Sequence, residues 1–189
     1  LKLNLPGKHN VLNATAASVL AIEEGVSLIN IKSALEKFSG IRRRMEFLGK
    51  LGDTVVIDDY GHHPTEIKNT ILTLRESFPG LEITMVFQPH RFSRTKDLYE
   101  EFVEVLQLVE GLILLEIYSA GEKPIDGISS SALLESLKDK GLKNLWLANS
   151  NKHALELISS SFSKKKEVLL IQGAGSISDI SKKLMLESS

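Results

Sequence analysis

The sequence contains no cysteine, which excludes disulfides, thiolate nucleophiles and cysteine-ligated zinc sites. It has no apolar run of about 18 residues, the length that a membrane-spanning helix needs, and residues 1–10 lack the apolar segment of a signal peptide. Basic and acidic residues nearly balance, at a formal net charge of −1, so bulk charge attracts neither nucleic acid nor an anionic membrane. We therefore expect a globular protein in which any anion site consists of locally placed groups. The lack of cysteine is compatible with a reducing compartment, and a cytoplasmic location is expected.

A phosphate-binding loop of the form Gly-x-x-x-x-Gly-Lys-Ser/Thr is also absent from the sequence. The two Gly-Lys pairs, Gly7-Lys8 and Gly49-Lys50, lack the flanking residues of that pattern. The first residue is Leu1 rather than methionine, and we expect the chain to begin inside a longer protein.

The first 40 residues predict one strand and two helices. Leu1–Leu5 alternates apolar and polar residues, as a half-buried strand does, and Pro6-Gly7 ends it. Apolar residues at helical spacing predict helices over residues 10–24 and through Ile31–Phe38, each closed by a glycine. A unit of this size does not bury a sufficient core, so we expect residues 1–40 to be the tail of a larger domain.

From residue 41 onward the pattern changes. After the basic stretch Ile41–Arg44, residues 45–50 and 54–57 flank a Leu-Gly-Asp turn and predict a β-hairpin. Apolar strands then alternate with amphipathic helices, which predicts an α/β fold over residues 41–189: a doubly wound, mainly parallel, Rossmann-like sheet with an N-terminal β-hairpin. The expected strands are 83–87, 112–117, 145–148 and 168–171, and the expected helices are 65–77, 96–109, 131–140, 152–162 and 176–186.

Ligands of doubly wound sheets bind beyond the carboxyl ends of the strands, and the first polar cluster follows the hairpin directly. Residues 58–64 contain two aspartates, a tyrosine and two histidines. One interpretation is a polar turn with an aspartate as helix cap and Pro64 in the first helical turn. Another is a metal site formed by Asp59, His62 and His63, although adjacent histidines tend to point apart.

Two further clusters follow predicted strands. Residues 88–95 place Arg91 and Arg94 three residues apart before a helix, where the guanidinium forks and the helix dipole together favour a carboxylate or phosphate. The same residues could instead form ordinary surface salt bridges. Residues 172–176 contain Gly-Ala-Gly-Ser, which indicates either a ligand loop or only a tight turn.

Three residues that precede these clusters, Asn10, Asn13 and Arg44, each have two interpretations. The amide side chains of Asn10 and Asn13 can contact the edge of a base, but asparagine is also a good helix starter. Arg44 can pair with phosphate or with the nearby Glu46.

Taken together, these segments resemble the Mur ligase family, and within it the branch that joins L-alanine to UDP-N-acetylmuramate. The resemblance extends over nearly the whole chain in the family's order. It rests on residues 6–10, Asn13-Ala14, Ala16-Ala17, 38–40, 43–46, 59–65, 88–95, 118–122 and 172–175. Ser176 departs from the acidic or amide residue that many relatives carry after the last of these segments.

The resemblance implies an ATP-dependent ligase of peptidoglycan synthesis that forms an amide through an acyl phosphate. Residues 1–40 would then be the tail of a central α/β ATPase domain, and residues 41–189 the amino-acid-binding domain. It also implies ATP and Mg²⁺ as cofactors, with the magnesium ligands and phosphate loop outside this chain, so that the chain alone is expected to be inactive. Nothing in the chain need act as a covalent nucleophile, because the reaction depends on positioning and charge stabilisation.

The resemblance further assigns roles to individual residues. Arg91 and Arg94 would hold the carboxylate of L-alanine, with His62 beside them and Tyr60 shaping the pocket. For the nucleotide, Asp59 would bind the ribose hydroxyls of ATP, Arg44 the ribose or phosphate, and Asn10 and Asn13 the adenine. Alternatives are a related ligase that adds a preformed peptide, a folylpolyglutamate-type ligase, and a non-catalytic module that binds a nucleotide or an amino acid.

Overall fold

The computed structural model describes residues 3–161 and 166–187, and the chain divides between Arg42 and Arg43 into two compact units. The N-terminal unit consists of helices α1 (Lys8–Glu23) and α2 (Leu28–Lys37). Helix α2 begins after Ser27, whose hydroxyl accepts the backbone N–H of Asn30 at 3.4 Å, because an N-cap acceptor satisfies an otherwise free amide. Ile31 alone is buried among the described residues of this unit, so its two helices enclose no core of their own.

The strand expected at the start of the chain is wrong for Leu3–Leu5, which form an irregular segment; Leu1 and Lys2 lie outside the described residues. Asn4 in this segment donates its side-chain N–H to the carbonyl of Glu36 at 2.7 Å. An alternating sequence forms a strand only beside another strand. No described residue of this unit belongs to a strand, and the segment therefore has nothing to pair with.

The C-terminal unit is built on one six-stranded sheet with the order β1-β2-β6-β3-β4-β5. Strand β1 pairs antiparallel with β2 as a hairpin, and the remaining neighbours are parallel. The doubly wound, mainly parallel sheet with an N-terminal hairpin is thus confirmed. The strands are β1 (Glu46–Leu51), β2 (Thr54–Asp59), β3 (Glu82–Phe87), β4 (Gly111–Leu115), β5 (Asn144–Ala148) and β6 (Glu167–Gln172).

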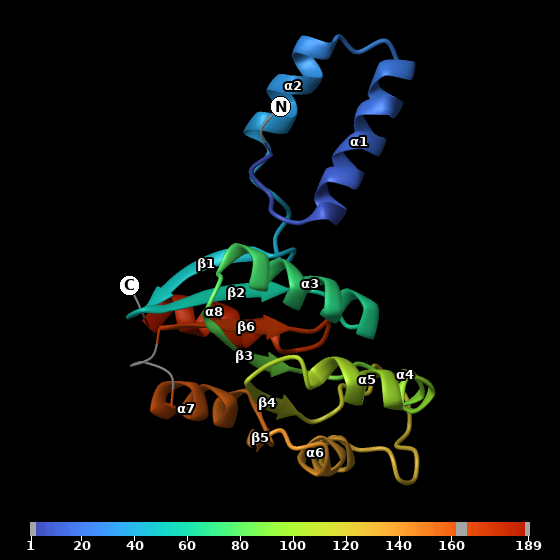
Figure 1. Ribbon diagram of the computed structural model, residues 1–189. Helices are drawn as coiled ribbons and strands as arrows, with labels where there is room; N and C mark the ends of the chain where they lie inside the picture. The colour runs from blue at the N-terminus through green and yellow to red at the C-terminus, as the bar shows by residue number, and fades with distance from the viewer. Residues whose placement is uncertain (1–2, 162–165, 188–189) are drawn as a thin grey trace. The chain divides into compact units, whose positions relative to one another are not determined.

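Helices cover both faces of this sheet (Figure 1). Alternate residues of a strand point to opposite faces, so Val55 and Ile57 of β2 lie in one core cluster and Val56 in the other. Helices α3 (Pro64–Ser77), α5 (Tyr99–Leu106) and α6 (Ser130–Asp139) pack on the first face. Helices α7 (Asn151–Ser161) and α8 (Ser178–Glu187) pack on the second.

The helix expected over residues 96–109 is two helices. Helix α4 (Phe92–Asp97) starts earlier than expected and is separated from α5 by Leu98, whose φ of −116° and ψ of 25° leave the helical region. The apolar spacing predicts which side of the segment is buried, but it carries no signal for a bend at a residue that itself packs on the core, as Leu98 does. Because α4 starts early, Arg91 is its N-cap residue and lies in the loop that follows β3.

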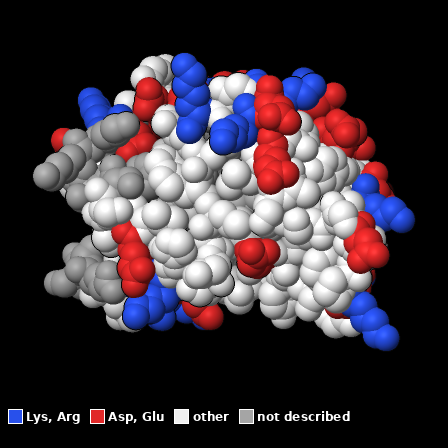
Figure 2. Space-filling model, turned by 90° about the horizontal axis from the view of Figure 1, so that it is seen from below, with Lys and Arg blue, Asp and Glu red and all other residues white. Residues whose placement is uncertain are grey.

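The face that Figure 2 shows is mostly uncharged. Basic and acidic groups are mixed around its margin, and one acidic group lies near its centre. Among the described residues, no helix has both the length and the apolar character to cross a bilayer.

The core of the first face gives a direct test of the packing. Phe102 on α5 is fully buried, with its ring 5.8 Å from that of Phe87 on β3. Phe102→Ala should lower the free energy of unfolding by about 3–5 kcal/mol, because it removes buried apolar contacts and leaves a cavity. Leu108→Ala, at a half-exposed position just after α5, is the control and should cost much less. Urea denaturation measures both, and equal losses would contradict this assignment of the core.

Candidate functional site

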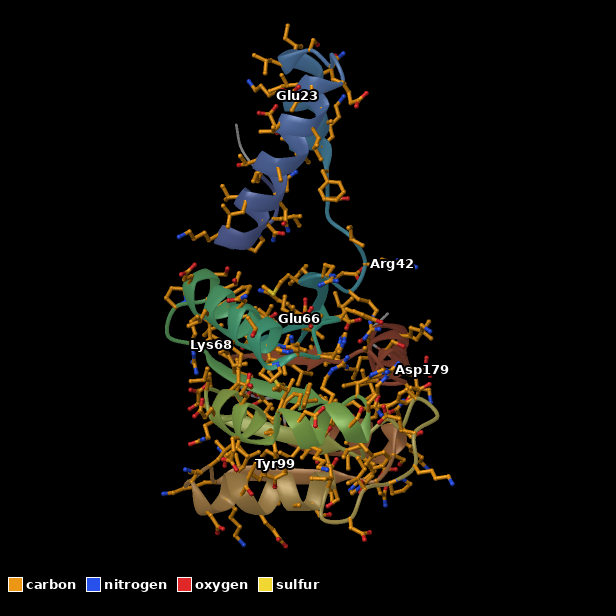
Figure 3. All side chains as sticks on the ribbon, turned by 90° about the vertical axis from the view of Figure 1, so that its right-hand side faces the viewer. Glu23, Arg42, Glu66, Lys68, Tyr99 and Asp179 are labelled. Atoms are coloured by element: carbon orange, nitrogen blue, oxygen red, sulfur yellow. The ribbon has the colours of Figure 1, made fainter. Side chains whose placement is uncertain are left out.

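Strands β2, β6, β3 and β4 all end at the same edge of the sheet, because they are parallel. Asp59 of β2 lies opposite Gln172 of β6, which lies opposite Phe87 of β3. The three polar clusters of the sequence, residues 58–64, 88–95 and 172–176, therefore come together at this edge. The strands point toward the right-hand side of Figure 1, and Figure 3 looks onto that side, with Glu66 labelled in the first turn of α3.

Asp59 is the last residue of β2 and is almost completely buried. Its Oδ1 accepts hydrogen bonds from the backbone of Gly61 at 2.8 Å, from Gln172 Nε2 at 2.9 Å and from Thr70 Oγ1 at 3.3 Å. Its Oδ2 accepts the N–H of Met45 at 3.0 Å. The carboxylate therefore ties together β2, β6, α3 and the entry to β1.

Arg43 is a residue of this edge that sequence reasoning missed. Its guanidinium pairs with Asp58 at 3.4 Å, donates to the carbonyl of Gly173 and lies with its centre 5.2 Å from that of the Tyr60 ring. Burial raises the pKa of Asp58 above its usual value, and the charge of Arg43 opposes that effect. Arg43 itself has a φ of 59°, so the chain turns sharply where it enters the C-terminal unit.

Arg44, the neighbour to which sequence reasoning assigned a role, is exposed and lies farther from the Tyr60 ring than Arg43 does. Its guanidinium centre lies 5.8 Å from the centre of the Tyr60 ring. Nothing in the sequence distinguishes the three consecutive arginines, since only the pairing of β2 with β6 decides which one reaches Gly173. The alternative pairing of Arg44 with Glu46 is not formed: it is the backbone N–H of Arg43 that donates to Glu46, at 2.8 Å.

The His-His-Pro segment is partly structural. The ring Nδ1 of His63 accepts the N–H of Thr65 at 3.3 Å, Pro64 is in the first turn, and Glu66 accepts the backbone N–H groups of His62 and His63. Burial raises the pKa of Glu66, but these two backbone donors outweigh it, and the pKa lies below its usual value. A capping box thus accounts for His63. The polar-turn interpretation is right about Pro64 in the first turn, but the cap is His63 and not an aspartate.

Tyr60 is exposed at this edge of the sheet, and His62 is half-buried there. The His62 ring lies 5.5 Å from that of Tyr60 and 5.5 Å from that of His90. Nδ1 of His62 is 3.2 Å from the carbonyl oxygen of Tyr60 and 3.8 Å from Glu66 Oε2. Across the residues that the structure describes, no group of three or more His, Asp or Glu is arranged to hold a metal ion.

His90 joins the two arginines to this group, and sequence reasoning gave it no role. Its ring stacks on Tyr118 with 5.3 Å between the centroids, and Arg94 Nη1 lies 3.4 Å from both its Nδ1 and its carbonyl oxygen. Burial lowers the pKa of His90, and the charges of His62, Arg94 and Arg91 lower it further. A neutral His90 can accept a hydrogen bond from Arg94 at Nδ1, which leaves the other guanidinium N–H groups free for a ligand.

Arg91 and Arg94 occupy different backbone environments. Arg91 is the N-cap of α4, with a φ of 73° and a ψ of 137°, and its side chain is exposed. Arg94 lies inside this six-residue helix and is half-buried. The carboxylate of Glu122 already accepts the N–H of Ser93 at 3.0 Å, so this N–H of the first turn is not free for a ligand. The charges of Arg94 and Arg91 both lower the pKa of their common neighbour His90.

The third cluster, residues 172–176, forms a tight turn that packs against Gln88 and Tyr118. A Cβ on Gly175 would collide with Gln88 Oε1 and would lie 2.9 Å from Cβ of Tyr118. Gln88 Oε1 accepts the N–H of Ile177 at 3.0 Å, and Gln88 Nε2 donates to Ser176 at 3.3 Å. Glycine is required here for close packing, which favours the structural interpretation of this segment.

The remaining two predicted residues belong to the N-terminal unit. Helix α1 begins at Lys8, so Asn10 and Asn13 lie within it rather than at its cap. Asn10 donates its side-chain N–H to the carbonyl of Pro6 at 2.7 Å. Asn13 is exposed.

Comparison with known proteins decides the family. The family model described as "Mur ligase, glutamate ligase domain" matches residues 43–175. The chain belongs to the Mur ligase family. The part of this Mur ligase that the family model matches contains Tyr60, His62, His90, Arg91 and Arg94.

Individual relatives are similar over almost the whole chain. UDP-N-acetylmuramate–L-alanine ligases of Desulfatibacillum aliphaticivorans and Blochmanniella floridana are each 44% identical to it, over 94% and 98% of the chain. A solved UDP-N-acetylmuramate–alanine ligase of Thermotoga maritima is 33% identical over 100% of the chain, with a TM-score of 0.80. The chain spans only 39–40% of the length of these three proteins.

The buried carboxylate of Asp59 should be needed for stability of this Mur ligase unit. Asp59→Asn replaces one acceptor oxygen with an N–H donor, so either Met45 N–H or the three donors to Oδ1 lose their partner. We expect a loss of about 1–3 kcal/mol in the free energy of unfolding, measured with urea. Asp53→Asn in the exposed β1–β2 turn is the matched control. A loss no larger than that of the control would mean that the carboxylate does not hold the edge together.

The position of His90 between two arginines should be visible in its titration. Its pKa should lie below the ordinary 6.5, so from pH 6.5 downward the unfolded chain binds a proton that the folded chain does not, and stability falls. Arg94→Ala should raise the pKa of His90, because removing a neighbouring cation favours the imidazolium. NMR titration of the ring resonances measures this shift.

Lys138→Ala, which removes a positive charge from the far end of α6, is the control and should leave the titration of His90 unchanged. If Arg94→Ala left the pKa where it was, the guanidinium would not lie against His90 in solution.

Proposed function

We propose that this chain is the C-terminal region of an ATP-dependent ligase that joins L-alanine to UDP-N-acetylmuramate in peptidoglycan synthesis. Residues 1–40 are the tail of its central ATP-binding domain, and residues 41–189 form its amino-acid-binding domain. The observation that carries the proposal is the group of cationic and aromatic side chains at one sheet edge, in a chain 44% identical to ligases of that name.

The site is suited to an amino acid because two guanidinium groups can donate hydrogen bonds to its carboxylate. Arg91 and Arg94 bind the carboxylate of L-alanine, with His62 beside them and Tyr60 closing one side of the pocket. Guanidinium groups suit this role because their planar fork can bind both carboxylate oxygens. His90 accepts from Arg94 and orients it, and as a neutral imidazole it adds no third charge to be compensated before the substrate arrives.

The reaction of such a ligase forms an amide from a phosphorylated carboxylate. The amine of L-alanine attacks the acyl phosphate of UDP-N-acetylmuramate, and phosphate leaves. This chain contributes by positioning: the two arginines fix the carboxylate end of the amino acid, so that its uncharged amine has a defined direction of approach. Holding two reactants in register in this way can replace much of the entropy loss of a bimolecular step.

The nucleotide contacts are proposed on the chemistry of the side chains. Asn10 and Asn13 contact the adenine, Arg44 the ribose or phosphate, and Asp59 the ribose hydroxyls. Asp59 already accepts four hydrogen bonds from the protein, so a hydroxyl must share Oδ2 with the N–H of Met45. Magnesium ligands and the phosphate loop belong to the remainder of the central domain in this proposal.

Arg94→Lys tests the proposal in a full-length ligase that contains this chain. Lysine keeps the charge but loses the planar fork, so binding of L-alanine should weaken by about 1.5–3 kcal/mol, the usual value of a charged hydrogen bond. The Michaelis constants for ATP and UDP-N-acetylmuramate should hardly change. Phosphate release at varied L-alanine measures the effect.

L-Alaninamide is the matched substrate, because it keeps the amine and lacks the carboxylate. It should be poor with the wild type and should lose little more in Arg94→Lys. Equal losses for L-alanine and its amide would show that Arg94 does not bind the carboxylate. An absence of L-alanine-dependent phosphate release in the wild type would refute the proposed function itself.

A further inference from the structure

Helix α4 begins at a residue that cannot cap it. The N-cap side chain normally accepts a hydrogen bond from a backbone N–H of the first turn, but arginine carries only donors. Accordingly, the Arg91 side chain makes no capping bond. Its φ of 73° is also a conformation that side chains with a Cβ rarely adopt, so neither the backbone nor the side chain of Arg91 favours this helix start.

A carboxylate from a distant segment replaces the missing cap. Glu122 Oε2 accepts the N–H of Ser93 at 3.0 Å, and Glu122 Oε1 accepts the Ser93 hydroxyl at 2.7 Å. The two donors of Ser93 lower the pKa of Glu122 below its usual value, so the group is ionised at neutral pH. Both oxygens of the carboxylate are therefore held by one residue in the first turn of α4.

The segment that carries Glu122 also holds the backbone on the other side of Arg91. The carbonyl of Tyr118 accepts the N–H of Arg91 at 2.8 Å, and the N–H of Tyr118 donates to Pro89 at 2.8 Å. Between Tyr118 and Glu122 the chain forms a tight turn, closed by Glu122 N–H to Ser119 carbonyl at 3.0 Å. Ala120 and Gly121 in that turn have φ values of 50° and 87°, as a type I′ turn requires.

We propose that Glu122 is a positioning residue for the amino-acid carboxylate. By capping α4 in place of Arg91, it fixes the backbone that carries Arg91 and Arg94, so that both side chains are placed to bind one carboxylate. This inference rests on the proposed function. Glu122 does not touch the substrate. It acts through Ser93, which lies between the two arginines in sequence, while the carbonyl of Tyr118 accepts the backbone N–H of the strained residue Arg91.

The consequence is specific to ligands with a carboxylate. Without the cap, the first turn of α4 has no acceptor for Ser93, and the φ of Arg91 can relax toward a more favourable region. The Arg91–Arg94 pair then loses the arrangement proposed for binding one carboxylate, and a displacement of this kind at a binding group can change rates by up to about a hundredfold. Contacts to ATP and the UDP-sugar come from other residues and should not depend on Glu122.

The test uses Glu122→Gln and Glu122→Asp in the full-length ligase, with Glu135→Gln on the exposed side of α6 as the control for loss of one negative charge. Glu122→Gln should raise the KM for L-alanine about tenfold, with kcat and the KM for ATP nearly unchanged. Turnover of L-alaninamide should stay at the wild-type level. Glu122→Asp keeps the charge but is one methylene shorter, and it should also raise the KM for L-alanine.

Ser93→Ala separates positioning from general damage. It should raise the KM for L-alanine by itself, but it should add little in the Glu122→Gln background, because both substitutions remove the same contact. Thermal unfolding of each variant, followed by circular dichroism, shows whether the protein is still folded at the assay temperature.

The outcomes distinguish this inference from the proposed function. A wild type without L-alanine-dependent turnover would overturn both. An active wild type with equal losses for L-alanine and L-alaninamide in Glu122→Gln would overturn the positioning role alone. Full activity of Glu122→Asp would also overturn it, since charge without the correct reach would then be sufficient.

Discussion

Four segments of the C-terminal unit converge on the carboxylate of Asp59. It accepts hydrogen bonds from Met45 before β1, Gly61 after β2, Thr70 on α3 and Gln172 at the end of β6. Because the group is buried, each of these donors would be left without a partner if the carboxylate moved. The loops after β2 and β6 leave the sheet at this point, so their positions depend on it.

The site concentrates positive charge and compensates it with carboxylates that serve local structure. Arg91 and Arg94 lie near His62 and His90, and burial together with the charges of these neighbours lowers the pKa of His90 and favours its neutral form. Glu66 and Glu122 stand nearby, but their oxygens are engaged by the first turns of α3 and α4. They therefore reduce the repulsion without neutralising the arginines, which leaves an excess of positive charge for an incoming anion.

Individual residues show how far sequence reasoning reached. The clusters after β2, β3 and β6 were recognisable because polar residues directly follow apolar strands, and parallel strands bring those ends together. The contributions of Arg43, His90 and Glu122 were not, since each depends on a partner more than 20 residues away, namely Gly173, Tyr118 and Ser93. The helix start at Phe92 was misplaced for the same reason, because its cap comes from another loop.

The sequence by itself determined the α/β class, the hairpin, the alternation of strands and helices and the residue types of the site. Hydrophobic periodicity and turn residues are local, and the chain displays them directly. Only the tertiary structure decided which of three arginines pairs with Asp58, which carboxylate caps α4 and which histidine lies against Arg94. Those choices follow from the strand order and from the paths of loops between strands, which bring residues together across long stretches of chain and leave no periodic signal in it.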